Sequence, residues 1–174
     1  MEELKIEVHS PHQALAKYVR SILITTASDL NDEITPTVPT GFSYFTYSRF
    51  PVKLSYSKAV IESADQLYLV GQLDKELPYF TIKGNFFHVG LELFPASMYY
   101  FFNTKGREIM DKGILLKEKA PLLAKQLRQG LSSVDDPLQV AGIMQDALIS
   151  QLSTLDTIPI LDNTMEIILR KNGN

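Results

Sequence analysis

The fold is decided by the stretch Asn85-Phe86-Phe87-His88-Val89-Gly90-Leu91-Glu92-Leu93-Phe94-Pro95, which holds the longest clean two-residue alternation in the sequence. Successive side chains of a strand point to opposite faces, so one face here would be wholly apolar and the other mixed. The apolar face is Phe87, Val89, Leu91 and Leu93. The mixed face is Phe86, His88, Gly90 and Glu92, a set that suits water or a lined cavity. Pro95 has no N–H to give to a ladder, so the strand should end there.

The composition fits one domain, or one domain with a helical extension, because the chain has 174 residues and 45% of them are hydrophobic. It contains no cysteine, which excludes disulfides and thiolate metal sites and fits a reducing cytoplasm. The N-terminus lacks the pattern of a signal peptide, and no apolar stretch approaches the roughly 20 residues that span a bilayer. The net charge is -3 with no dominant basic stripe. We therefore expect a cytoplasmic protein that makes no membrane contact and that binds nucleic acid poorly by itself.

The residues before this stretch predict one helix and several short strands. Residues 10–24 open like a helix, with Ser10 as cap and Pro11 at the first helical position, although the β-branched end from 22 to 26 could already be strand. A polar loop is expected from 27 to 40. Strands are expected twice within 41–56, and at 59–61, 66–72, 79–83 and 86–94, with a hairpin turn at Lys83-Gly84-Asn85. Many short strands at regular spacing indicate a sandwich or a small barrel.

After Pro95 the pattern changes to a helical period. Helices are expected at 96–103 and 104–112, from Pro121 to about 129, behind Asp136-Pro137, and at 160–171. The helix behind Asp136-Pro137 carries a continuous apolar stripe, which we call the α-stripe. The α-stripe consists of Val140, Ile143, Met144, Ala147, Leu148 and Leu152. Its periodicity leaves open whether it packs against the strands or forms a dimer seam.

The order of these patterns resembles the N-terminal domain of AraC-family transcriptional regulators, in the subgroup whose strand reads roughly Gly-x-x-Phe-x-Pro. The matching residues are Pro11, Leu15, Tyr18, Val19, Gly71, Gly90, Phe94 and Pro95. Residues 160–174 look like the linker helix that leads into the paired helix-turn-helix domain of these regulators, and the chain stops where that domain would begin. The resemblance covers nearly the whole chain through short motifs.

The resemblance implies an α+β fold, a cupin-like β-barrel (double-stranded β-helix) followed by a C-terminal helical subdomain. The barrel with its N-terminal helix would take residues 1–95, the helical and dimerising part 96–158, and the linker helix 159–174. It implies a homodimer, a small-molecule effector as partner, and DNA contact only through the C-terminal domain. The family varies widely in effector, so the resemblance supplies no ligand residues.

Two groups of residues are candidates for function. Aromatic walls with a few polar groups suit a small-ligand pocket, which makes Tyr44, Tyr47, His88 and Glu92 the pocket candidates. His88 and Glu92 share a strand face at roughly 13 Å, too far for a direct hydrogen bond. The dimer-seam candidates come from the α-stripe and are Ile143, Met144, Ala147, Leu148 and Leu152. The alternatives are that the tyrosines simply fill a small barrel and that His88 and Glu92 are ordinary surface or cavity-edge residues. The α-stripe could equally be core that packs against the barrel.

Catalysis, cofactors and metals are not expected. The histidines are His9, His12 and His88, and two of them precede the barrel strands, so a several-imidazole metal site is not predicted. Neither a nucleophile elbow nor a glycine-rich phosphate loop is present. Three hypotheses remain: the regulatory domain of an AraC-type regulator, a stand-alone cupin-like small-molecule binding protein or enzyme, and a purely structural dimerisation module.

Overall fold

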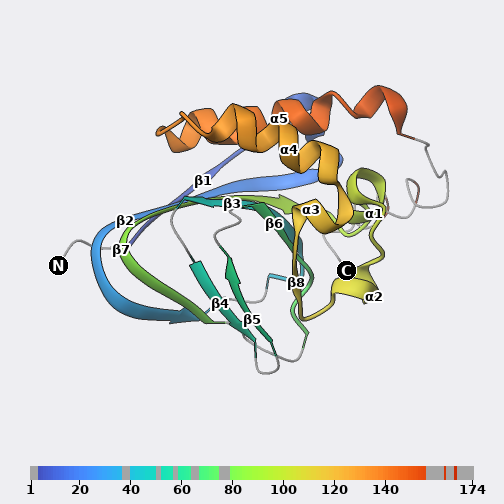
Figure 1. The fold of residues 1–174 in the computed structure, drawn as a ribbon. Helices are drawn as coiled ribbons and strands as arrows, with labels where there is room; N and C mark the ends of the chain where they lie inside the picture. The colour runs from blue at the N-terminus through green and yellow to red at the C-terminus, as the bar shows by residue number, and fades with distance from the viewer. Residues whose placement is uncertain are drawn as a thin grey trace.

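The computed structural model places strands and helices in a single α+β arrangement (Figure 1). The structure describes residues 4–36, 40–49, 52–56, 59–63, 67–74 and 79–155, together with Asn163 and Ile167. Of the helix predicted at 160–171, all but those two single residues lie outside this part of the chain.

The described strands form one antiparallel sheet. They are β1 (Lys5–His9), β2 (Val19–Pro36), β3 (Ser43–Arg49), β4 (Val52–Tyr56), β5 (Ala59–Ser63), β6 (Leu67–Val70), β7 (Tyr79–Leu93) and β8 (Gly113–Leu115). The main path runs β1-β2-β7-β3-β6-β8, while β4 pairs with β5 and with β7. The two long strands β2 and β7 bend together, so that β4 and β5 lie across from β3 and β6 (Figure 1).

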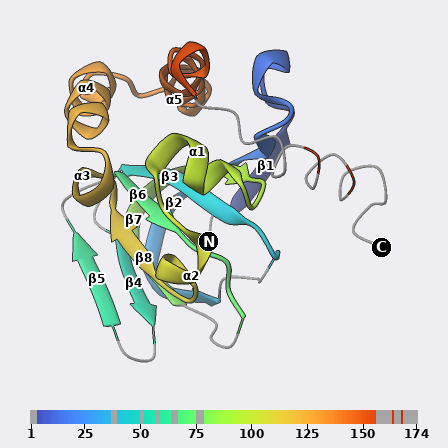
Figure 2. The same cartoon turned by 90° about the vertical axis from the view of Figure 1, so that its right-hand side faces the viewer.

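The described helices are η1 (Gln13–Leu15), α1 (Ser97–Phe102), α2 (Gly106–Ile109), α3 (Leu116–Lys119), α4 (Pro121–Leu131), α5 (Pro137–Ile149) and η2 (Leu152–Thr154). Helices α4 and α5 cover the side of the sheet away from β4 and β5, whereas α2 lies at one end of the sheet, on the right in Figure 1 (Figures 1 and 2). The predicted start of α5 is confirmed, because the Asp136 carboxylate accepts from the Leu138 N–H at 3.0 Å and Pro137 occupies the first turn.

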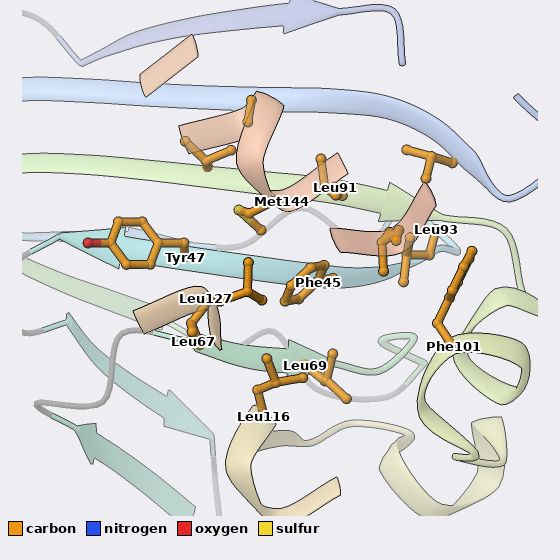
Figure 3. Close-up of a cluster of buried hydrophobic side chains, with 14 of the residues drawn as sticks. Phe45, Tyr47, Leu67, Leu69, Leu91, Leu93, Phe101, Leu116, Leu127 and Met144 are labelled. Atoms are coloured by element: carbon orange, nitrogen blue, oxygen red, sulfur yellow. The ribbon is translucent and has the colours of Figure 1, made fainter. Parts of the chain in front are cut away.

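One hydrophobic core lies between the helices and the sheet (Figure 3). Val89, Leu91 and Leu93 of β7 are fully buried there, as the alternation predicts. Facing them from α5 are Val140, Met144 and Leu148, which are also fully buried. The strand ends at Leu93, before Pro95, as expected. Residues on both sides of the boundary at 95 therefore share a single core, and β8 adds a strand from the helical segment to the sheet by pairing with β6.

The helix predicted for 10–24 is wrong apart from the three-residue turn η1. His12, not Ser10, caps that turn, since its Nδ1 accepts from the Ala14 N–H at 3.1 Å. Strand β2 begins at Val19, and its pairing with β7 is irregular between Val19 and Ser21. The extra residue of this β-bulge turns both Val19 and Ile22 into the core. The three-residue spacing between the apolar residues Val19 and Ile22 resembles a helical pattern, but here a bulge in a strand produces it.

The predicted loop is wrong for 27–36, residues 37–39 lie outside the described part of the chain, and the hairpin turn predicted at Lys83-Gly84-Asn85 is also wrong. Strand β2 continues to Pro36, and β7 runs unbroken from Tyr79, with Leu30 paired to Gly84 and Pro36 to Tyr79. Two further irregularities, after Ala27 and after Leu30, interrupt the alternation of β2 and hide the strand from a pattern search. The strands expected within 41–56, at 59–61 and at 66–72 are confirmed as β3 to β6.

Gly71 marks the point where the sheet meets the helical segment most closely. A Cβ added at Gly71 would lie 1.8 Å from the carbonyl oxygen of Ile109, so no side chain fits there. The Gly71 N–H donates to the Lys112 carbonyl at 2.9 Å, and the Asp111 N–H donates to the Gln72 carbonyl at 2.9 Å. This contact guides the chain from α2 into β8.

Candidate functional site

The face of the sheet opposite the helices carries polar side chains, and we call it the inner face because β2 and β7 bend around it (Figure 1). The register places Tyr44 beside Glu92, Thr46 beside Gly90 and Ser48 beside His88. Tyr68 of β6 lies opposite Thr46. The polar residues of the inner face are Ser21, Tyr44, Thr46, Ser48, Tyr68, His88 and Glu92. The register places Leu23, Val70, Phe86 and Gly90 on the same face, and Val70 and Leu73 pack with Tyr68 and Tyr44 in a small apolar cluster. The polar residues form two hydrogen-bonded clusters, one around Glu92 and one around His88.

The Glu92 cluster is built on the bulge at the start of β2. In a regular strand Arg20 and Ser21 would point to opposite faces, but the extra residue lets both reach Glu92. Glu92 Oε2 accepts from Arg20 Nη1 at 2.6 Å and from Ser21 Oγ at 2.7 Å. Glu92 Oε1 accepts from the Tyr44 hydroxyl at 3.0 Å. The carboxylate is almost completely buried, while the Arg20 side chain is 51% exposed.

These contacts keep Glu92 ionised. Burial alone would raise the pKa of its carboxyl, but hydrogen bonds from Ser21, Arg20 and Tyr44 outweigh burial and hold the pKa below its usual value. The neighbouring Tyr44 is affected in the opposite sense, because burial raises the pKa of its phenol to about 12. The Arg20 guanidinium also lies over the Phe42 ring, 4.7 Å from its centroid. Glu92 is therefore an ionised carboxylate that is already paired with Arg20 and hydrogen-bonded by Ser21 and Tyr44.

The His88 cluster is uncharged. Ser48 Oγ hydrogen-bonds both His88 Nδ1, at 2.8 Å, and the Tyr68 hydroxyl, at 2.9 Å. The Tyr68 hydroxyl also lies 3.3 Å from His88 Nδ1. The Phe86 ring stacks on the imidazole with centroids 6.0 Å apart and an interplanar angle of 10°. Burial lowers the pKa of His88 to about 4 and raises that of Tyr68 to about 12, so both rings are neutral at pH 7.

Gly90 connects the two clusters. A Cβ at Gly90 would lie 3.4 Å from His88 Nε2, 3.7 Å from Thr46 Cγ2 and 3.7 Å from Tyr44 Cδ1. Because Gly90 has no side chain, only backbone atoms lie between the imidazole of His88 and the Tyr44 ring at this position. Glu92 lies two residues further along, roughly 13 Å from His88 on strand rise, and does not orient the imidazole. Ser48 and His88 form a hydrogen-bonding pair, and Glu92 is not placed as the carboxylate that would complete a hydrolase triad with them.

Three of the four predicted pocket candidates lie on this inner face, namely Tyr44, His88 and Glu92. Tyr47 does not, because it occupies the opposite face of β3, in the helix-covered core, with its ring 5.9 Å from that of Phe87 (Figure 3). The sequence reasoning missed Arg20, Ser21 and Ser48, and it did not connect the strand tyrosine Tyr68 with His88. A signal for Ser48 was present in the alternation of β3, where Tyr44, Thr46 and Ser48 share one face.

The dimer-seam candidates divide into two groups. Met144 and Leu148 are fully buried within the single chain, against β7 and its neighbours, so neither side chain has surface left for a partner. Ile143, Ala147 and Leu152 are partly buried and pack against the same core. The α-stripe is thus mainly a core surface of the monomer.

Within the part of the chain that the structure describes, no three His, Asp or Glu side chains come together to hold a metal ion. None of the described helices has the length and apolarity needed to cross a membrane. In comparisons with known proteins, no family model, no curated protein and no solved structure matched this chain.

Proposed function

We propose that this chain is the effector-sensing and dimerisation domain of an AraC-type transcriptional regulator, with a cupin-like β-barrel as its sensor. In the full regulator, effector binding would change how two DNA-binding units are placed. A ligand can do this only through a difference in its affinity for the two arrangements.

The observation that carries the proposal is the polar inner face. A barrel that serves only as structure is most simply filled with apolar side chains, because a buried polar group is costly unless it is hydrogen-bonded. Here Thr46, Ser48 and Tyr68 are buried and His88 is half-buried on one face of three adjacent strands. Neutral hydroxyls and an imidazole beside the Phe86 ring suit the recognition of a small polar molecule.

The residues behind the family resemblance have structural roles that fit the proposal. Leu15 and Val19 lie in the core, and the Tyr18 carbonyl accepts from the Phe94 N–H at 3.0 Å and from Ser97 Oγ at 2.7 Å. The Tyr18 ring makes an edge contact with Phe101 at 5.3 Å. This set joins the N-terminal segment to the point where strands give way to helices.

Ligand screening by thermal denaturation tests the sensing role. A ligand present at 100 times its dissociation constant should add about 2.7 kcal/mol to the free energy of unfolding. Tyr68→Phe removes one hydroxyl from the inner face, and Tyr47→Phe removes one from the opposite face of the neighbouring strand. Tyr68→Phe should weaken binding of any ligand found, and Tyr47→Phe should leave it unchanged. If no member of a broad metabolite set shifts the melting temperature, or if both variants weaken binding equally, sensing at this face is overturned.

The regulator assignment has a separate test in the coding sequence that follows Asn174. Two helix-turn-helix units encoded there would support it, and a stop codon at that position would contradict it. Because this test does not involve the inner face, a stand-alone binding protein would pass the ligand screen and fail here.

A further inference from the structure

Strand β1 is an edge of the sheet with apolar side chains left in solvent. Among the described residues it pairs with β2 alone, and no described strand pairs with its second edge. Ile6 is 60% exposed and Val8 is 66% exposed, although both belong to a regular strand. Proteins usually protect a free edge that carries apolar residues, since it can pair with another strand.

We propose that β1 pairs with β1 of a second copy of this chain, antiparallel and centred on Ile6, so that one sheet continues across the dimer. The proposal rests on the dimer included in the proposed function and adds the surface that forms it. The most deeply buried members of the α-stripe cannot supply that surface, because Met144 and Leu148 have no exposed area.

Charge and polarity select this register. An antiparallel pairing must set apolar residues opposite apolar ones, or the faces of the two strands conflict. If the twofold axis of the pairing passed through Lys5 or through Glu7, two like charges would lie directly opposite each other, which is unfavourable. Centring on Ile6 sets Lys5 opposite Glu7 of the second copy, twice by symmetry, and Ile6 opposite Ile6.

The same register covers the exposed apolar residues. Ile6 and Val8 share one face of β1, and Leu4, the half-buried residue before the strand, would lie opposite Val8 of the second copy. Six apolar side chains would then form a continuous patch across the twofold axis. On the other face Lys5 and Glu7, which contact each other within one chain, gain cross-strand partners of opposite charge. An isologous contact of this kind closes after two copies and does not lead to a fibre.

Single cysteines test the register, because the chain contains no cysteine of its own. Ile6→Cys would bring two thiols opposite each other across the axis, at the roughly 4.5–5.5 Å Cα spacing that a disulfide spans. Val8→Cys is the matched control, since its two copies would be displaced by four residues, about 13 Å. Both positions are exposed, so the variants should remain folded, which circular dichroism checks. Under mild oxidation Ile6→Cys should give a covalent dimer on a non-reducing gel and Val8→Cys should not.

Charge reversal gives a second readout in solution. Lys5→Glu and Glu7→Lys should each weaken the homodimer by about tenfold in sedimentation equilibrium, because each sets like charges opposite. Mixing the two variants should restore association as a heterodimer, because the acid introduced in one chain then lies opposite the base introduced in the other. Lys125→Glu, on an exposed position of α4, is the control and should not change association.

The outcomes separate the two proposals. A wild-type chain that stays monomeric at every concentration overturns both the edge pairing and the dimer of the proposed function. A wild-type dimer with no Ile6→Cys cross-link, or with equal cross-linking of Val8→Cys, overturns the β1 pairing alone. Failure of the mixed variants to associate also overturns it. None of these results bears on ligand sensing at the inner face.

Discussion

Ser48 Oγ and His88 Nδ1 lie 2.8 Å apart on the neighbouring strands β3 and β7, and the Tyr68 hydroxyl closes a triangle with both. The three groups come from segments separated by 20 residues or more, and only the strand order β7-β3-β6 brings them together. The triangle carries no charge at neutral pH, whereas the Glu92 cluster at the same face holds an ion pair. The inner face thus combines a neutral hydrogen-bonding patch around His88 with a separate carboxylate, Glu92, whose partners come from the same chain.

The first prediction concerns the acid stability that His88 controls. Its pKa is about 4 when folded, against a usual value of 6.5, so between these pH values the unfolded chain binds a proton that the folded chain does not. Stability is therefore fully present above pH 6.5 and falls as the pH drops toward 4, by up to about 3 kcal/mol from this group. Urea unfolding at pH 7.5 and pH 5 should show the loss in the wild type, and His88→Gln should reduce it. An equal pH dependence in both proteins would contradict the buried neutral imidazole.

The second prediction concerns the buried carboxylate of Glu92. Glu92→Gln replaces an acceptor by an amide group that cannot accept from all three of Arg20, Ser21 and Tyr44, and should cost about 1–3 kcal/mol. The contribution of the charge is present above pH 4.5 and is lost as the pH falls, because the folded pKa is lowered. Glu108→Gln is the matched control, since its contact with Lys119 at 3.3 Å is exposed. It should change stability by less than about 1 kcal/mol in urea unfolding at pH 7.

The third prediction distinguishes core from seam at Leu148. Because Leu148 is fully buried within the chain, Leu148→Ala should cost about 2–5 kcal/mol, and Leu148→Asp should give unfolded or aggregated protein. Leu138→Ala, in the same helix but 54% exposed, should cost far less. Size-exclusion chromatography with urea unfolding provides the measurement. A folded, monomeric Leu148→Asp protein would instead place this residue at a dimer seam.

Regular segments could be predicted from the sequence because each carries an undisturbed period. The alternation of β7 from Phe86 onward identifies its buried face, and the cap and proline at Asp136-Pro137 identify the start of α5. Of β2, only the β-branched residues 22–26 are recognisable as strand from the sequence, because its irregularities shift the side-chain period three times along its length. The same bulge that hides the start of the strand also brings Arg20 and Ser21 to Glu92, so the contacts of these two residues with Glu92 escape prediction.

The composition of the site was partly predictable for a related reason. His88, Glu92 and Tyr44 stand out as polar groups on alternating strands, but a residue's neighbours depend on the register between strands far apart in sequence. Nothing in the local pattern of β6 joins Tyr68 to His88, which lies 20 residues away. Tyr47 was a pocket candidate because it is a tyrosine in a strand, and the phase of β3 places it in the core instead.

The last prediction concerns Gly71, where the helical segment meets the sheet. An alanine Cβ would lie 1.8 Å from the Ile109 carbonyl oxygen, and because that atom belongs to the backbone, α2 or β6 would have to move. The hydrogen bonds from Gly71 to Lys112 and from Asp111 to Gln72 would be strained with it. Gly71→Ala should therefore lower the free energy of unfolding by at least about 1–3 kcal/mol, as overpacking does.

Gly142→Ala is the opposite case, since nothing lies within 4 Å of its added Cβ and the residue is inside α5. It should stabilise the protein by about 0.5–1 kcal/mol, because alanine favours the helix. Urea unfolding should thus show that the same glycine-to-alanine change lowers the free energy of unfolding at position 71 and raises it at position 142. If Gly71→Ala leaves the free energy of unfolding unchanged, α2 does not contact the end of β6 this closely.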